Sequence, residues 1–258
     1  MRVLIPVLFL GFLVPLSASA QKPPTEPGAI PLYVVKAVND PERAADRDND
    51  ARRQMIAVMT FTRVKPGDKV MELIPASGYW TRVFSQLVGE KGHVYTIWPT
   101  ETEKKFSVKD LAMWQELVKT PHYNNVSVLL QSIAMPHAPV PVDLVFTDDN
   151  YHDLHDPFFG PVNMAKFNKD IYDALKPGGT FVIVDHQAPA GSGTSDTNTL
   201  HRIDPAAIKT EVEAAGFVFD GSSDALYNPG DPLTIAVFDK SIRGHTSQVI
   251  YRFLKPLR

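Results

Sequence analysis

The chain has 258 residues, of which 44% are hydrophobic and 21% are charged, a balance typical of globular proteins. It contains no cysteine, which excludes a disulfide scaffold, a thiolate metal site and a cysteine nucleophile. With 26 basic and 29 acidic side chains the formal net charge is −3, so the charge balance gives no sign of a nucleic-acid partner, and none is expected.

Residues 1–20 have the pattern of a secretory signal peptide. Arg2 precedes an almost entirely apolar run, residues 3–16, and small residues follow at positions 17–20 (SASA), where a signal peptidase reads the chain. An uncleaved membrane anchor is the alternative, but a spanning helix needs about 20 apolar residues and this run is shorter. We therefore expect cleavage after Ala20 and a periplasmic or secreted protein that keeps no stable membrane anchor.

The mature chain is expected to begin with an extended lead-in, residues 21–40, which contains several prolines. One domain, residues 41–258, follows, and its first part, residues 41–63, is charged and helical in pattern. Strand-like apolar runs and amphipathic stretches then alternate. The expected strands are residues 69–74, 93–98, 126–130, 142–147 and 180–185, and the expected helices are residues 79–88, 108–119, 164–175 and 205–215.

This alternation predicts a mainly parallel sheet that helices cover on both faces. The C-terminal part differs, because no helical stretch separates the last two strand candidates, residues 217–219 and 248–255. We expect these two strands to pair antiparallel.

A ligand-binding turn is predicted at the end of the first strand. In an open parallel sheet, ligands bind beyond the carboxyl ends of the strands, at the point where the strand order reverses. Here Glu72 is followed by a turn that ends in small residues, 75–78 (PASG), and then by a helix. Small side chains let a ligand approach the backbone, and the start of a helix offers unpaired N–H groups.

From this turn onward the sequence resembles the class I S-adenosylmethionine-dependent methyltransferases, and the resemblance covers about residues 41–258. The segments that carry it are residues 64–68 (VKPGD), 72–78 (ELIPASG), 142–146 (VDLVF), 175–185 (LKPGGTFVIVD) and 213–217 (EAAGF). Two further segments, residues 228–231 (NPGD) and 238–244 (FDKSIRG), are similar to a subgroup of predicted, often exported methyltransferases.

The resemblance implies an α/β fold, a three-layer sandwich with a seven-stranded, mostly parallel, Rossmann-like sheet that ends in an antiparallel hairpin. It also implies S-adenosyl-L-methionine as the cofactor. The implied reaction is transfer of the cofactor's methyl group to an acceptor, here an unidentified small molecule.

The resemblance places the cofactor at the turn after the first strand and at the end of the second. The implied cofactor-binding residues are Glu72, Pro75, Ala76, Ser77, Gly78 and Trp98. The family's turn carries three alternating glycines, whereas Ile74 and Ala76 occupy the first two of these positions here. Because such residues adopt positive φ only at a cost, we expect the turn to follow a different path. Trp98 stands near the position of the family's ribose-binding acid, and it either stacks on adenine or packs as a core or rim indole.

The acceptor is expected beyond the fourth strand, at residues 147–156 (TDDNYHDLHD), which in the family border both the methyl donor and the acceptor. An imidazole or a carboxylate there can orient an acceptor and remove its proton. The implied catalytic residues are Asp149, Asn150, His152, Asp185 and His186, with Tyr151 beside them. The alternative is that these side chains cap loops and satisfy local backbone groups. His201 follows a glycine- and serine-rich loop, residues 191–197, and is expected near the same rim.

The same region also suggests a metal site as an alternative. Oxygen and imidazole donors of the kind that Zn or Mn accepts are found at His152, Asp153, His155, Asp156, Asp185 and His186. The spacing of the first two histidines is not that of the ligand pair on a metalloprotease helix. The sequence therefore predicts no metal.

Two other function classes stay open. A non-catalytic small-ligand-binding protein on a methyltransferase scaffold is compatible with the altered turn, and with export away from the cytosol, where the cofactor is made. A dehydrogenase-like nucleotide binder is less favoured, because the missing glycines and the missing ribose acid count against it as well.

Overall fold

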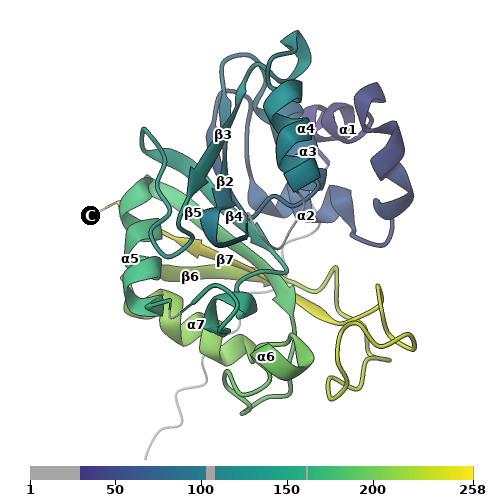
Figure 1. The fold of residues 1–258 in the computed structure, drawn as a ribbon, viewed down its shortest axis with the longest axis vertical. Coiled ribbons are helices and arrows are strands. Elements are labelled where there is room, and N and C mark those ends of the chain that lie inside the picture. Colours follow the sequence, from purple (N-terminus) through teal and green to yellow (C-terminus); the bar gives the residue numbers. More distant parts are fainter. Residues whose placement is uncertain (1–29, 103–107, 161, 258) are drawn as a thin grey trace, which may run out of the picture.

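The computed structural model describes residues 30–102, 108–160 and 162–257 (Figure 1). The predicted signal peptide, residues 1–20, and the first part of the lead-in, residues 21–29, lie outside the described residues. Cleavage and export therefore stay predictions. In the part of the chain that is described, no helix is both long enough and apolar enough to cross a membrane.

A seven-stranded sheet forms the centre of the molecule, with the strand order β3-β2-β1-β4-β5-β7-β6 (Figure 1). Its strands are β1 (Lys69–Leu73), β2 (His93–Pro99), β3 (Val126–Gln131), β4 (Val142–Asp148), β5 (Leu175–His186), β6 (Val218–Ser223) and β7 (Gln248–Leu254). Strands β1 to β5 run parallel, whereas β7 pairs antiparallel with both β5 and β6. The predicted fold, a mostly parallel sheet that ends in an antiparallel hairpin, is confirmed.

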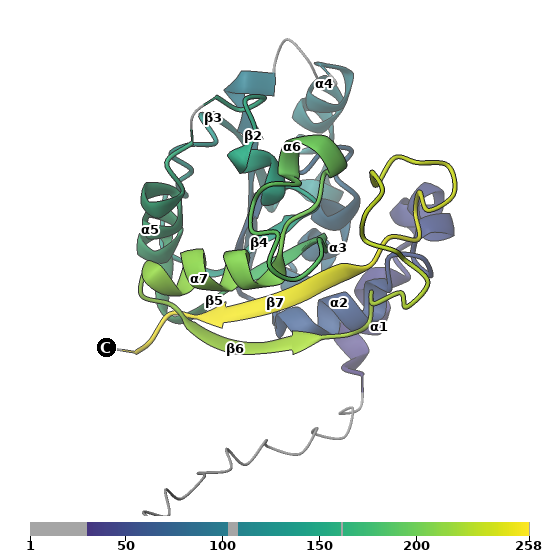
Figure 2. The same ribbon diagram turned by 90° about the horizontal axis from the view of Figure 1, so that it is seen from below.

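Helices cover both faces of this sheet (Figures 1 and 2). One face carries α1 (Leu32–Val38), α2 (Met55–Thr62), α3 (Tyr79–Val88) and α4 (Val108–Leu117), the other carries α5 (Met164–Ala174) and α7 (Pro205–Ala214), and the short α6 (Thr197–Leu200) follows β5. Successive strand residues point to opposite faces. Accordingly Val70 and Phe146 pack in the core under α1 to α4, whereas Met71 and Val145 pack in the core under α5 and α7.

The N-terminal part differs from the expected extended lead-in. Residues 32–38 form α1 instead, because Val34, Ala37 and Val38 are buried on one side of a helix that packs against α2 and α3. The helical segment that follows is divided. A 3-10 helix, Pro41–Asn49, is separated from α2 by Gln54, whose φ of 47° is left-handed.

The strand order reverses at β1, which lies between β2 and β4. A crevice is therefore expected above the carboxyl ends of β1 and β4. β5 begins at Leu175, directly after α5, and its register shifts before Thr180, so the Lys-Pro-Gly-Gly segment belongs to this strand rather than to a separate loop. Beyond the bulge β5 runs beside β4 and ends at the same edge of the sheet, where it places His186.

Candidate functional site

A cavity of about 700 Å³ opens at the carboxyl ends of the parallel strands. One side, here called the β1–β2 wall, is lined mainly by apolar residues: Ile74, Pro75, Ala76, Trp98, Pro99 and Leu130. The opposite side, here called the histidine wall, is polar and is lined by Asp149, Asn150, His152, Asp153, His186 and His201. The volume lies within the usual range of small-molecule sites, about 300–1,000 Å³.

The turn after β1 has positive φ at all three positions where the family carries glycine. Ile74 has a φ of 52°, Ala76 a φ of 48° and Gly78 a φ of 77°, so the expectation of a different path was wrong. The backbone N–H of Ile74 donates to the carbonyl of Ile97 at 3.0 Å, and the N–H of Gly78 donates to the carbonyl of Pro75 at 2.8 Å. The first of these bonds joins the turn to β2 and the second closes the turn, and together they hold a conformation that costs a non-glycine residue about 1–2 kcal/mol.

Gly78 serves packing rather than ligand contact, since it does not line the cavity. A Cβ at this position would lie 2.2 Å from the ring of Trp114. The indole of Trp114 in turn donates to the carbonyl of Ser77 at 3.3 Å. Only glycine permits this approach of α4 to the turn.

Glu72 and Ser77 line a second, smaller cavity of about 170 Å³ on the other side of the turn. This cavity shares Ile74, Ala76 and Asp149, among others, with the large one, so the two adjoin. Glu72 is buried and accepts a hydrogen bond from the hydroxyl of Thr81 at 2.6 Å. Burial raises the pKa of Glu72 to about 8. The carboxyl group therefore keeps its proton at neutral pH and does not act there as an anion.

An ion pair between Arg53 and Asp148 also lines the small cavity. The guanidinium of Arg53 donates to a carboxylate oxygen of Asp148. Burial raises the pKa of Asp148 to about 6, against the opposing charge of Arg53. Arg53 was not singled out from the sequence, because its place in a charged run, residues 46–53, indicates only a solvated helix face.

Trp98 packs as the core or rim indole that was one of its two expected roles, and stacking on adenine stays a prediction. Its side chain is 8% exposed and belongs to the hydrophobic core, yet it also lines the β1–β2 wall. Its indole N–H donates to the hydroxyl of Thr96 at 3.0 Å, which fixes the ring.

The buried carboxylate of Asp185 binds His152 at two points. Nδ1 of His152 lies 2.6 Å from one carboxylate oxygen of Asp185, and the backbone N–H of His152 donates to the other oxygen at 2.8 Å. Burial alone would raise the pKa of Asp185, but the charge and hydrogen bonds of His152 outweigh it and lower the pKa. Asp185 is fully buried and does not line the cavity, so it positions His152 rather than touching a ligand.

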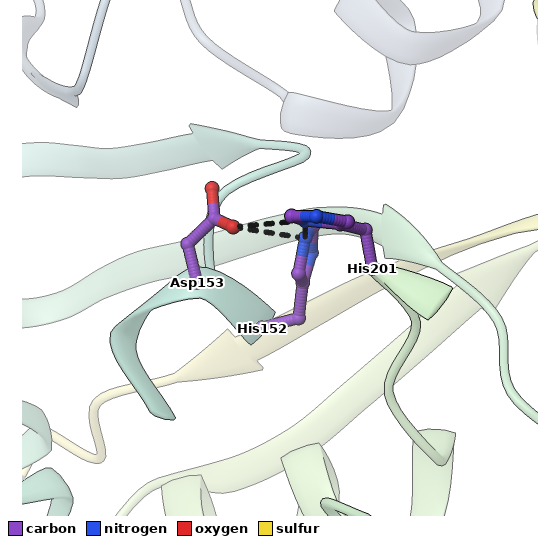
Figure 3. Close-up of side chains that lie close together, drawn as sticks. All are labelled: His152, Asp153 and His201. Atoms are coloured by element: carbon purple, nitrogen blue, oxygen red, sulfur yellow. Dashed lines mark hydrogen bonds and ion pairs between the residues drawn. The ribbon is translucent and has the colours of Figure 1, made fainter. Parts of the chain in front are cut away.

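Asp153 and His201 approach the other nitrogen of His152 (Figure 3). Nε2 of His152 lies 3.1 Å from Oδ1 of Asp153 and 3.4 Å from Nδ1 of His201. Nδ1 of His201 is also 3.4 Å from the same oxygen of Asp153. His201 ends α6 with a φ of 53°, a left-handed conformation that nothing in the local sequence indicates.

Asp149 and His186 form the part of the histidine wall nearest the turn. Their side chains are 3.4 Å apart, and Asp149 also accepts a hydrogen bond from the amide of Gln248. Burial raises the pKa of Asp149 to about 6, and burial lowers the pKa of His186 to about 4. At neutral pH Asp149 is thus an anion that is more basic than an ordinary carboxylate, and His186 is neutral. Asp149 has a φ of 57°, so the strand end is strained here too.

Two residues of the predicted acceptor segment lie elsewhere. Tyr151 is fully buried, and its hydroxyl donates to Glu211 at 2.9 Å, so it does not line the cavity. His155 also faces Glu211, at 3.3 Å. Asn150 does line the cavity, and its amide donates to the carbonyl of Asp148. For Tyr151 the expectation was wrong, because its ring serves the core under α5 and α7.

No family model matches the chain. Over 142 residues, or 54% of the chain, the sequence is 32% identical to a protein-L-isoaspartate O-methyltransferase of Methanosarcina mazei. The match covers 47% of that protein, so the chain spans about half the length of this curated relative.

Solved methyltransferase structures share the fold. A SAM-dependent methyltransferase from Aquifex aeolicus gives a TM-score of 0.53 at 20% identity, over 85% of this chain and 96% of that one. Aeropyrum pernix fibrillarin, crystallised with natively bound S-adenosyl-L-methionine, gives 0.50 at 16% identity, over 80% and 76%. The chain therefore has the fold of S-adenosylmethionine-dependent methyltransferases, and over 54% of its length its sequence is similar to that of a methyltransferase.

Proposed function

We propose that the protein transfers a methyl group from S-adenosyl-L-methionine to a small-molecule acceptor bound against the histidine wall. One observation carries this proposal: a single cavity joins the apolar β1–β2 wall to a wall of carboxylates, an amide and imidazoles. A nucleoside needs an apolar slot with few polar groups, whereas a nucleophile that must lose a proton needs acceptors for it. The same cavity provides the apolar surface and the proton acceptors.

The two adjoining cavities suit the two ends of the cofactor. The adenosine part would lie along the β1–β2 wall, with Trp98 against the base. The amino-acid end carries a carboxylate and an ammonium group. The small cavity offers both matching charges, the guanidinium of Arg53 and the carboxylate of Asp148. The sulfonium would then lie near Ala76 and Asp149, which line both cavities.

The reaction in this arrangement is an in-line displacement. The acceptor's oxygen or nitrogen gives an electron pair to the methyl carbon as the carbon–sulfur bond breaks, and that bond's electrons stay on sulfur, which becomes a neutral thioether. The acceptor's proton passes to the carboxylate of Asp149, a residue that lines both cavities. Alignment of donor and acceptor supplies most of the rate enhancement. An oxygen acceptor is favoured, because the relative from Methanosarcina mazei is named as an O-methyltransferase.

We further propose that the protein works in the periplasm or outside the cell, on the strength of the signal-peptide pattern of residues 1–20. The second candidate function is a non-catalytic protein that holds another small ligand. It is favoured by the strained turn, in which Ile74 and Ala76 replace the family's glycines.

Calorimetric titration with S-adenosyl-L-methionine and S-adenosylhomocysteine tests the proposal. We expect saturable binding of both, and Trp98→Ala should weaken it about 5- to 150-fold, the value of one base–aromatic stack. Trp98→Phe should restore part of the affinity because it keeps a ring. Tyr227→Ala, which removes an exposed aromatic side chain outside the cavity, is the matched control.

Absence of binding to either compound would contradict the methyltransferase proposal and favour the ligand-binding alternative. A fluorescence titration of the same preparations with NADH tests the dehydrogenase-like alternative. Where the donor binds, release of S-adenosylhomocysteine in mixtures of small hydroxyl, carboxyl and amine compounds identifies the acceptor.

A further inference from the structure

The three side chains of Figure 3 converge from two separate segments of the chain. His152 and Asp153 follow β4, whereas His201 ends α6. One nitrogen of each imidazole and one oxygen of the carboxylate all lie within 4.8 Å of one another. We propose that His152, Asp153 and His201 bind a divalent transition cation of the Zn²⁺ type, with its open coordination position facing the cavity.

The triangle of ligand atoms has the dimensions that such an ion requires. Two ligand atoms that are each about 2.1 Å from one ion, at a tetrahedral angle, are about 3.4 Å apart. The three sides of the observed triangle measure 3.1, 3.4 and 3.4 Å. A proton on Nε2 of His152 joins one pair of these atoms, whereas an ion at the centre joins all three.

The surroundings of His152 are those of a metal ligand. A histidine that ligates a metal through one nitrogen usually donates its other ring N–H to a carboxylate, which fixes the tautomer and the ring orientation. Asp185 provides this carboxylate at 2.6 Å from Nδ1. Nδ1 of His152 is occupied by Asp185, so Nε2 is the ring nitrogen that faces Asp153 and His201.

One further observation supports the site. Asp156 lines the same cavity and is 2% exposed, yet its Oδ1 has no hydrogen-bond partner among the described residues. Asp156 and Asp153 thus place two carboxyl groups on this side of the cavity.

The cation's place in the reaction rests on the proposed function. All three ligand residues line the cavity, so the open position faces the space assigned to the acceptor. An acceptor oxygen that coordinates there loses its proton more readily, and Asp149 remains to receive it. The inference therefore narrows the acceptor to compounds with an oxygen donor, such as a hydroxyl or a carboxylate group.

Calorimetry with Zn²⁺ on the metal-free full-length protein, prepared without a histidine tag, tests the site. We expect one Zn²⁺ per chain, and Mg²⁺ binding at least tenfold more weakly, because that ion prefers oxygen ligands. Asp153→Asn keeps the shape of the side chain and should weaken zinc binding at least tenfold. His201→Gly should do the same, and it relieves the positive φ, so a failure to fold does not explain its effect.

Asp185→Asn should weaken zinc binding about 10- to 100-fold through the orientation of His152. The exposed His137, outside the cavity, is the control, and His137→Ala should bind zinc as the parent does. Lack of zinc binding by the parent protein, or equal binding by the Asp153 and His201 variants, overturns the inference.

The same preparations are titrated with S-adenosylhomocysteine. Cofactor binding without zinc binding overturns the metal site alone. Zinc binding without cofactor binding supports the metal site and contradicts the methyltransferase proposal.

Discussion

The two walls of the cavity are built in opposite ways. The β1–β2 wall comes mainly from local sequence, since the turn after β1 and the end of β2 supply most of it. The histidine wall draws on β4, β5 and the end of α6, so residues as far apart as Asp149 and His201 meet there. Backbone shape defines the first wall, whereas side-chain chemistry defines the second. In the proposed function, the first wall binds the cofactor and the second binds the acceptor.

Glu72, which lines the small cavity next to the first wall, gives the largest expected change in stability. Its pKa is 4.5 in an ordinary setting and about 8 in the folded protein. Both states hold the proton below pH 4.5. As the pH rises from 4.5 to 8 the unfolded chain releases it first, and the folded state loses stability. Glu72→Gln should thus be more stable than the parent by several kcal/mol at pH 8, and nearly equal to it at pH 4.5.

Urea denaturation at the two pH values measures this difference. A Glu72→Gln variant that is less stable than the parent at pH 8 would show that an anion at this position stabilises the fold, contrary to its burial.

Gly78→Val should destabilise the protein by about 3 kcal/mol or more, because it combines overpacking with a strained backbone. The new side chain meets the ring of Trp114, and φ is +77°. Gly191→Val is the matched control, since φ is +85° there and no atom lies within 4 Å of a Cβ. The control should lose only about 1–2 kcal/mol. Equal losses in thermal denaturation would mean that contact with α4 does not shape the first wall.

Ala76→Gly should stabilise the protein by about 1 kcal/mol, because it relieves a positive φ of 48° at an exposed position. Ala206→Gly, at an exposed helical position in α7, should instead destabilise it by about 0.5–1 kcal/mol. A loss of stability in both variants would contradict the strain assigned to the turn. Cofactor affinity, measured in parallel, shows whether the strained form is the one that binds.

The smallest expected effect is that of a substitution in the histidine wall on cofactor binding at the β1–β2 wall. Asp153 and Trp98 line opposite walls of the cavity. When two residues share no partner, a substitution at one usually changes the free-energy contribution of the other by no more than about 0.5 kcal/mol. Asp153→Asn should therefore alter S-adenosylhomocysteine affinity by no more than about twofold. A larger change in calorimetry would show that the two walls act as one unit.

Much of the site was predictable because its residues follow strands. Asp149, Asn150, His152 and His186 lie at the ends of β4 and β5, and parallel strands bring their carboxyl ends to one edge of the sheet. The separate roles of these residues were not predictable. Asp185 immediately precedes His186 in the chain, yet side-chain alternation buries it behind His152.

The alternation of apolar strands and amphipathic helices by itself determined the layers of this protein and the edge at which ligands bind, because both follow from local periodicity. Tertiary structure alone decided the turn at Ile74 and the meeting of His201 with His152 and Asp153. Both depend on left-handed backbone conformations of non-glycine residues. Local propensity disfavours such conformations, and contacts with distant parts of the chain, such as that of Ile74 with Ile97, help to stabilise them.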